Sequence, residues 1–301
     1  MPLTLEYKIC ASNNNQTLKD FLKQQNLSKK AIVAIKHQGG NICVNGRKQT
    51  TRAILKTGDL VGITFPDEQV SSHLQPLTMT LEIIYEDDFL LVINKSAGLA
   101  TLPTGNHDIS LANGILAYYQ KIGLSSTVHF INRLDKDTSG LLVVAKYRHI
   151  QHQLTRNLKT ITRKYYALVR GILKTDGLID APIARLNADS VKRVVHPSGK
   201  RAITHYEVVK HYLGSTLIKC TLKTGRTHQI RVHMSHLGYP IVNDPLYGDG
   251  NKGDMQLLHS YFLAFTHPLT GELLSFETAI GQRFEHFIKC QNETLPKCRL
   301  I

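Results

Sequence analysis

A polar segment over residues 66–78 constrains the fold more than any other feature of this 301-residue chain. It reads PDEQVSSHLQPLT, contains two prolines and shows no helical or strand period of apolar residues. Such composition is typical of a linker between folded units. We therefore expect a small N-terminal unit over 1–65, a linker over 66–78, a larger unit over 79–290 and a C-terminal tail over 291–301 that shows no chemistry.

The N-terminal unit has the pattern of a small mixed domain. Apolar residues at helical spacing predict a helix over 17–25, and Ser28 is suited to cap a second helix from Lys29 to His37. A short strand over 42–44 runs into the turn former Asn45-Gly46, and a further strand follows over 60–65. These elements predict a compact α/β module.

In the larger unit, segments of strand length and period alternate with a few helices. The clearest is 217–222, where Ile218, Cys220 and Leu222 alternate with polar residues, as expected for a strand with one face in water. The unit is therefore predicted to be an α+β domain built on a mixed, mostly antiparallel sheet with flanking helices. The expected strands are 81–85, 89–94, 141–146, 164–171, 205–210 and 217–222, and the expected helices are 110–119 and 149–158.

The chain is strongly basic, with 37 Lys and Arg against 23 Asp and Glu, a formal charge of +14 and a pI near 9.5. Positive charge spread over a folded surface suits a polyanionic partner, because neutralising phosphates releases their counterions. No apolar run approaches the ~18–20 residues that cross a bilayer, and the first residues lack the pattern of a signal peptide. We therefore expect a soluble, cytoplasmic protein.

Cysteine and histidine spacing does not favour a metal site. The five cysteines are odd in number and none forms a CxxC pair, so neither a disulfide framework nor a zinc ribbon is predicted. His228 and His233 are five residues apart, which does not place them on one helical face, and His236 adds no second cluster. Helix surface or RNA contact is the favoured interpretation of these histidines. The oligomeric state is not readable from the sequence, and we expect a monomer.

The segment 131–146, INRLDKDTSGLLVVAK, is a polar loop that leads into a buried strand. Its Asp-Thr-Ser-Gly stretch consists of turn formers whose side chains hydrogen-bond to nearby backbone. Such a loop can hold a carboxylate rigidly at the mouth of a strand. On physical grounds Asp135 and Asp137 are both candidates for a catalytic carboxylate, and a turn-forming role is the commoner one for loop aspartates.

This segment resembles the signature of the RluA-type pseudouridine synthases, whose usual form is HRLDxxTSGLL. The resemblance implies that Asp135 is the essential catalytic residue, and that Arg133 fills the gap left by a flipped nucleotide or binds its phosphate. The sequence departs from the signature at Asn132, where His is common. Because this position is not the carboxylate, the departure does not exclude activity.

Three further segments resemble the same family in the same order. YEDD at 85–88 followed by VINKSAG at 92–98 is similar to the early YEDxxLLVVNKPAG strand pair, and RKYYALV at 163–169 is similar to a KxYxALV strand. TGRTHQIRVH at 224–233 is followed by GYPI and DPLYG. The resemblance implies a base-stacking tyrosine at Tyr166, with Tyr165 on the opposite face of the strand, and a buried arginine paired to Asp135 at Arg231, with Arg226 as the alternative. Four segments in order over about 80–280 make the resemblance specific.

The resemblance also implies RNA as the partner. Asn132, Arg133, Arg226 and His228 are expected to contact RNA near the site. The N-terminal unit resembles the RNA-binding module of ribosomal small-subunit protein S-four, in which a basic helix pair faces RNA, and its contacts to phosphate position the RNA without reading sequence. Large-subunit ribosomal RNA is the common substrate of relatives with this module. The expected phosphate contacts in the module are Lys29, Lys30, Lys36, Arg47, Lys48 and Arg52.

The implied reaction breaks the bond between uracil and ribose, turns the base and rejoins it through carbon. Neither redox chemistry nor hydrolysis occurs, so no metal or cofactor is expected. One carboxylate can act as a nucleophile or as a base, and the sequence leaves both routes open. A glycosidase needs two carboxylates across the bond, and Asp137 is interpreted as a loop former. The alternatives are an RNA-binding assembly factor and an RNA glycosidase or nuclease.

Overall fold

A computed structural model describes residues 2–68, 73–103, 109–156 and 160–293 of the chain. The chain divides into two compact units. Unit 1 comprises residues 1–79, 112–129 and 145–156, and unit 2 comprises residues 80–111, 130–144 and 157–301. Most of the predicted C-terminal tail lies outside the described residues.

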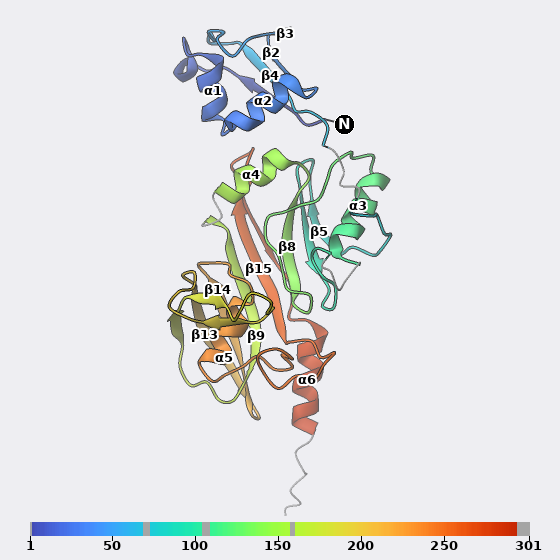
Figure 1. The fold of residues 1–301 in the computed structure, drawn as a ribbon, viewed down its shortest axis with the longest axis vertical. Coiled ribbons are helices and arrows are strands. Elements are labelled where there is room, and N and C mark those ends of the chain that lie inside the picture. The colour runs from blue at the N-terminus through green and yellow to red at the C-terminus, as the bar shows by residue number, and fades with distance from the viewer. Residues whose placement is uncertain (1, 69–72, 104–108, 157–159, 294–301) are drawn as a thin grey trace, which may run out of the picture. The chain divides into compact units, whose positions relative to one another are not determined.

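Unit 1 contains a four-stranded antiparallel sheet in the order β1-β4-β2-β3 (Figure 1). This sheet and the first two helices, α1 and α2, form a small domain at the N-terminus. Both helices begin at capping residues, because the Thr17 hydroxyl accepts from the Asp20 amide and the Ser28 hydroxyl accepts from the Ala31 amide. The elements are β1 (Thr4–Lys8), α1 (Leu18–Gln24), α2 (Lys29–His37), β2 (Asn41–Val44), β3 (Arg47–Lys48) and β4 (Leu60–Thr64), with a 3-10 turn at Ala11–Asn13, and unit 1 also holds α3 (Leu111–Lys121) and α4 (Arg148–Arg156).

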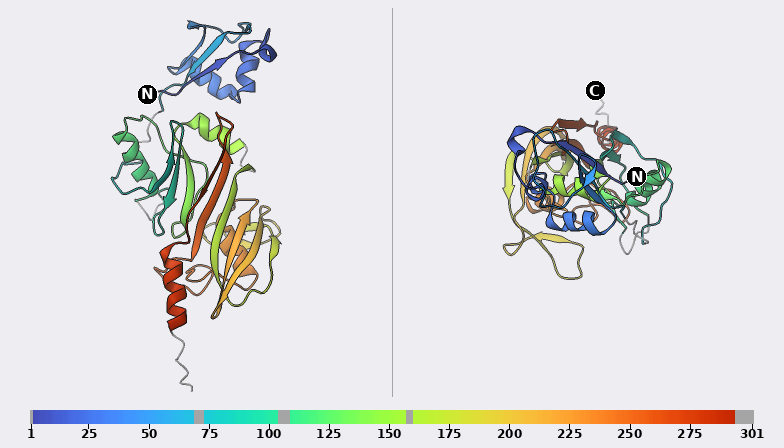
Figure 2. Two further views of the ribbon diagram at one scale, coloured as in Figure 1. Left: turned by 180° about the vertical axis from the view of Figure 1, so that it is seen from behind. Right: turned by 90° about the horizontal axis from the view of Figure 1, so that it is seen from above.

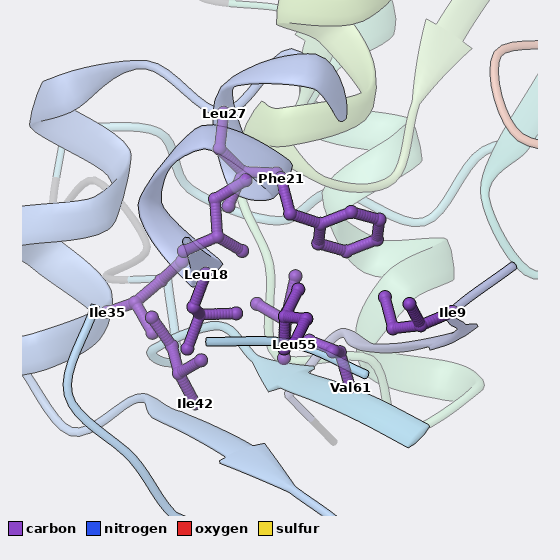
Figure 3. Close-up of a cluster of buried hydrophobic side chains, with 10 residues drawn as sticks. Ile9, Leu18, Phe21, Leu27, Ile35, Ile42, Leu55 and Val61 are labelled. Carbon is purple, nitrogen blue, oxygen red and sulfur yellow. The ribbon is translucent and has the colours of Figure 1, made fainter. Parts of the chain in front are cut away.

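The core of this small domain lies between the two helices and the sheet (Figure 3). Leu18 and Leu22 from α1 and Ile35 from α2 are fully buried against Val61 and Ile63 of β4. Burying such aliphatic side chains contributes about 1.5–3 kcal/mol each relative to exposure. The apolar spacing that predicted the two helices therefore corresponds to the side chains that hold them on the sheet.

Unit 2 is built on a ten-stranded sheet whose main path runs β10-β13-β14-β9-β15-β8-β6-β5, with β16 paired to β15 and β7 paired to β8. The long strands β9 and β15 lie side by side in Figure 1 and in the left panel of Figure 2. The strands are β5 (Ile83–Glu86), β6 (Leu90–Lys95), β7 (His129–Phe130), β8 (Ser139–Ala145), β9 (Thr162–Arg170), β10 (Gly177–Asp180), β13 (Ile203–Tyr212), β14 (Ser215–Leu222), β15 (Leu258–Thr266) and β16 (Leu273–Glu277), with a separate hairpin of β11 (Ile183–Arg185) and β12 (Arg193–Val195).

The register of the sheet joins distant parts of the chain at one glycine. β8 pairs parallel to β15, with Gly140 opposite Ser260. The pairs β5–β6, β9–β14, β9–β15, β10–β13, β13–β14 and β15–β16 are antiparallel. Gly140 has φ of 111°, and a Cβ there would lie 2.3 Å from the Ser260 carbonyl oxygen. Only glycine combines this φ with so close an approach. The mixed, mostly antiparallel α+β fold predicted from sequence is confirmed.

Two helices complete unit 2, α5 (Gln229–His236) and α6 (Gln282–Glu293). The cap position of α5 is His228, in a left-handed conformation with φ of 58°, and its side chain makes no capping hydrogen bond. The Gln229 side chain fixes the turn instead, since its oxygen accepts from the Arg226 amide and the Thr224 hydroxyl. In the described part of the chain, no helix is long and apolar enough to cross a lipid bilayer.

Candidate active site

A cavity of about 520 Å³ opens in unit 2 where three segments of the sequence meet. The loop before β8 contributes Asp135, β9 contributes Arg163 and Tyr165, and the turn into α5 contributes His228. α5 itself contributes Arg231. The fold therefore brings the family-like segments 131–146, 163–169 and 224–233 to one cavity, although they are far apart in the sequence.

Arg231 lies between two carboxylates. Its Nη1 donates to Asp135 Oδ2 at 3.0 Å, while its Nε and Nη2 donate to the two oxygens of Asp244 at 2.7 and 2.9 Å. Asp244 is fully buried and also accepts from the backbone amides of Leu246 and Tyr247. The bidentate pair with Asp244 fixes the guanidinium plane, and that plane in turn fixes the direction of the Asp135 carboxylate.

Arg231 and Asp244 each stabilise the charged form of the other. Burial lowers the pKa of Arg231, but its hydrogen bond to Asp244 and the charge of Asp135 outweigh burial and hold this pKa above its ordinary value. Burial raises the pKa of Asp244, and Arg231 outweighs that effect so that the pKa is lowered. Both groups are therefore charged at neutral pH. Asp135 is more open, with 26 % of its side chain exposed, which leaves one of its faces toward the cavity.

His228 and Tyr247 lie beside the Asp135–Arg231 pair. The His228 Nε2 lies 3.9 Å from Asp135 Oδ2, and its Nδ1 is hydrogen-bonded to the Tyr247 hydroxyl at 2.8 Å. The Tyr247 ring also stacks under the Arg231 guanidinium, with 5.1 Å from Cζ to the ring centroid. Burial lowers the pKa of His228, with the charge of Asp135 opposing it, so the imidazole is neutral at pH 7.

A buried lysine binds the backbone of the loop that carries Asp135. Lys95 is 1 % exposed, and its Nζ donates to the carbonyls of Ser96, Leu99 and Lys136 at 2.8–2.9 Å. Burial lowers the pKa of Lys95 to about 7, although Asp137 and Asp135 act to raise it. The Thr101 hydroxyl adds a bond to the Leu134 carbonyl at 2.6 Å. These bonds tie the segment after β6 to the loop that carries Asp135.

The expectation that Tyr166 faces this cavity is wrong. Tyr165 lines the cavity, whereas Tyr166 packs on the other face of β9 against Tyr261, with ring centroids 4.1 Å apart. Successive side chains of a strand point to opposite faces, so one of the two tyrosines must face away. Aligning the KxYxALV pattern on Ala167 selects Tyr165, and this alignment is the sequence signal that identifies the cavity-facing tyrosine.

The other predicted site residues of unit 2 also line the cavity. Arg133 and Arg226 are exposed at its rim, and Arg226 Nε donates to the Arg201 carbonyl at 3.0 Å. Asn132 is buried, and its Oδ1 accepts from the Val143 amide at 2.9 Å. The histidines after Thr227 separate in role, because His233 is fully buried and bonds to Thr204 and the Ala181 carbonyl.

The predicted RNA contacts of unit 1 are on its surface. Lys29, Lys30 and Lys36 are exposed on α2, and Arg47 is exposed on β3. These residues belong to unit 1 and do not line the cavity of unit 2. Within the described residues, no three His, Cys, Asp or Glu side chains are grouped to hold a metal ion.

A carboxylate oriented by a buried guanidinium, beside an aromatic side chain and under a basic rim, is suited to act on a base or sugar of a nucleic acid. Residues 89–236 match the family model for RNA pseudouridylate synthase. An uncharacterized RNA pseudouridine synthase of Bacillus subtilis, YjbO, is 41 % identical over 282 residues, covering 92 % of this chain and 99 % of that protein. Ribosomal large subunit pseudouridine synthase D of Neisseria meningitidis serogroup B is 38 % identical over 266 residues, covering 83 % and 71 %.

The solved structure of human RNA pseudouridylate synthase domain containing 4 has the same fold, with a TM-score of 0.58 at 24 % identity over 70 % of this chain and 92 % of that one. The fold and the sequence together define an isomerase that acts on RNA. This chain belongs to the RNA pseudouridine synthase family, and within it to the RluA type. The alternatives of an assembly factor and of a glycosidase or nuclease are set aside by this membership.

Proposed function

We propose that this protein converts specific uridines of large-subunit ribosomal RNA to pseudouridine, with Asp135 as the catalytic carboxylate, Arg231 as its charge partner and Tyr165 as the residue that stacks on the flipped base. The observation that carries the proposal is the geometry of Arg231, which spans Asp135 and the buried Asp244. Of the two aspartates in the loop, Asp135 is the one held in this way.

The chemistry follows from this geometry. The Arg231 guanidinium, 3.0 Å from Asp135 Oδ2, holds the carboxylate in a fixed direction, from which it can attack the sugar or pyrimidine or remove a sugar proton. The neutral His228 beside it does not compete as a second cation. A flipped uracil needs a flat surface, and Tyr165 offers one in the same cavity. Extruding a base costs a few kcal/mol, so loops and weakly paired sites are the preferred targets.

Two basic surfaces are suited to the rest of the RNA. One is the small domain of unit 1, whose two helices, short hairpin and exposed lysines resemble the S-four-like RNA-binding module. The other is a second cavity, of about 420 Å³, which shares Arg226 and Thr227 with the Asp135 cavity. Its lining includes the cations Arg185, Arg193 and Lys200 and no carboxylate. Contacts of this kind position the RNA and make its affinity dependent on salt.

Ribosomal RNA is proposed because several relatives bear names that specify the large ribosomal subunit. Besides the Neisseria protein, ribosomal large subunit pseudouridine synthase D of Yersinia pestis is 38 % identical over 260 residues. These names describe the relatives. The uridine that this protein modifies is to be identified by experiment.

The test is to map pseudouridine in total RNA by carbodiimide labelling and primer extension. Cells lacking this protein are compared with the same cells carrying wild type, Asp135→Asn or Asp137→Asn. We expect a stop in large-subunit ribosomal RNA that is lost on deletion and returns with wild type and Asp137→Asn but not with Asp135→Asn. In purified protein, Asp135→Asn should lower the rate by about 10²- to 10⁴-fold.

A stop that appears only in transfer RNA would overturn the choice of substrate while leaving Asp135 in place. Restoration by Asp135→Asn would overturn the catalytic assignment. RNA affinity of Asp135→Asn, measured by filter binding, is the control for folding and is expected to stay within about threefold of wild type, since asparagine keeps the shape of the side chain and the phosphate contacts that dominate affinity are made by other residues.

A further inference from the structure

Arg163 is a cavity-facing cation that the proposed mechanism does not use. It lies in β9 two residues before Tyr165, so the two side chains share one face of the strand. Both line the Asp135 cavity. Burial raises the pKa of Tyr165, and the positive charge of Arg163 opposes that rise, so the guanidinium acts on the phenol through space.

No protein group satisfies this guanidinium within the described part of the chain. The Arg163 Nε is buried and has no hydrogen-bond partner there, and no carboxylate lies within ion-pair distance of the side chain. Arg231, which lines the same cavity, makes three hydrogen bonds to carboxylates. Arg163 is half-buried, and it therefore differs from Arg231 in having a buried N–H donor without an acceptor.

The backbone holds Arg163 in this state. A Cβ on Gly225 would lie 2.7 Å from the Arg163 Nη1, so the guanidinium rests against the turn that precedes α5. A partly buried cation without a partner lowers the stability of the free protein. An anion entering the cavity recovers that free energy on binding, which is how a preorganised charge contributes most.

We propose that Arg163 binds a backbone phosphate next to the target uridine of the RNA. This inference rests on the proposed function for the presence of a flipped uridine in the cavity. A phosphodiester oxygen carries the charge that a guanidinium requires and accepts two of its N–H groups in plane. A uracil carbonyl or a ribose hydroxyl is neutral and would leave the buried charge uncompensated.

The test is a double-mutant cycle between Arg163 and the phosphate. The probe is a stem-loop RNA carrying the uridine identified by the mapping experiment, made with native linkages or with one neutral methylphosphonate on either side of that uridine. The proteins are wild type, Arg163→Gln, Arg163→Lys and Lys164→Gln. Lys164 is the matched control, because it is the next residue of β9, faces the other side over the Phe262 ring and removes the same charge.

We expect Arg163→Gln to weaken binding of the native RNA about ten- to one-hundredfold, the range for a hydrogen bond to a charged group. One of the two methylphosphonates should weaken wild type by the same factor and add nothing to Arg163→Gln. Arg163→Lys should recover part of the affinity, and Lys164→Gln should change it less than about threefold. Gly225→Ala, which pushes on the guanidinium, should weaken binding a few-fold in the same phosphate-dependent way.

The proposal is overturned if Arg163→Gln binds the native RNA as Lys164→Gln does, or if both methylphosphonates weaken Arg163→Gln as much as they weaken wild type. Because binding is measured on whichever RNA the mapping identifies, failure of the ribosomal assignment leaves this test intact. Failure of Asp135 as the catalytic residue also leaves it intact, since no turnover is needed.

Discussion

The exposed lysines of α2 in unit 1 and the buried cations of unit 2 use the same charge in different ways. Lys29, Lys30 and Lys36 extend from the surface of a domain whose stability comes from an apolar core. Arg231 and Lys95 are buried, and their donors are bonded to protein oxygens. Exposed cations are suited to attract and position RNA, whereas buried cations determine the geometry of the loop. Removing cations from α2 should therefore change RNA affinity, whereas removing the buried cations of unit 2 should change stability and activity.

The largest effect is expected for Arg231→Met. This change leaves the fully buried Asp244 carboxylate without its partner, and breaking such a pair costs about 3–5 kcal/mol of unfolding free energy. Urea unfolding followed by circular dichroism measures it. The double variant Arg231→Met with Asp244→Leu should recover much of the stability and none of the activity. Stability equal to wild type in the single variant would mean that the buried charges of unit 2 are not structural.

The two tyrosines of β9 provide a second comparison within unit 2. Tyr165→Leu should lower kcat/KM by the factor that corresponds to about 1–3 kcal/mol of activation free energy. This is the free energy of stacking one base on an aromatic ring. Tyr166→Leu removes a contact with Tyr261 on the other face and should mainly lower the free energy of unfolding. Steady-state kinetics and urea unfolding on both variants distinguish the roles. The reverse pattern would return the stacking role to Tyr166.

Lys95 gives a pH-dependent effect. Its pKa is about 7 in the folded protein and about 10.4 in an unfolded chain, so between these values the unfolded chain binds a proton that the folded one lacks. Stability attributable to this group therefore rises as pH increases from 7 toward 10, by up to about 1.4 kcal/mol per pH unit, and is flat below pH 7. Lys95→Met should lose this rise. Parallel pH profiles for variant and wild type would show that Lys95 stays charged.

The smallest effect is expected for the triple variant Lys29→Gln, Lys30→Gln and Lys36→Gln. It should leave kcat and unfolding unchanged and weaken RNA binding only a few-fold at moderate salt. The slope of log affinity against log salt should fall by about 2–3, because each lost phosphate contact contributes about 0.7–0.9. Filter binding over a salt series measures both quantities. An unchanged slope would remove α2 from the RNA interface.

Sequence reasoning succeeded where a side chain follows a local period or a family-like segment. It predicted both helices of the small domain, the mixed sheet and the loop that carries Asp135. It missed the β11–β12 hairpin, whose two strands of three residues each are too short to show a period. It also missed Lys95 and Arg163, because lysine and arginine are usually exposed and their burial depends on segments distant in sequence. Asp244 lies in the family-like DPLYG segment, but its pairing with Arg231 depends on how the chain folds.

The parallel contact between Gly140 and Ser260 has a consequence for synthesis of the protein. Ser139 reaches its partner His259 across 120 residues, and Asp135 reaches Arg231 across 96. A ribosome adds roughly 5–20 residues per second, so the loop with Asp135 emerges several seconds before the strand that anchors it. Such long loops also slow folding. We therefore expect a nascent chain to be unable to modify RNA until β15 has left the exit tunnel.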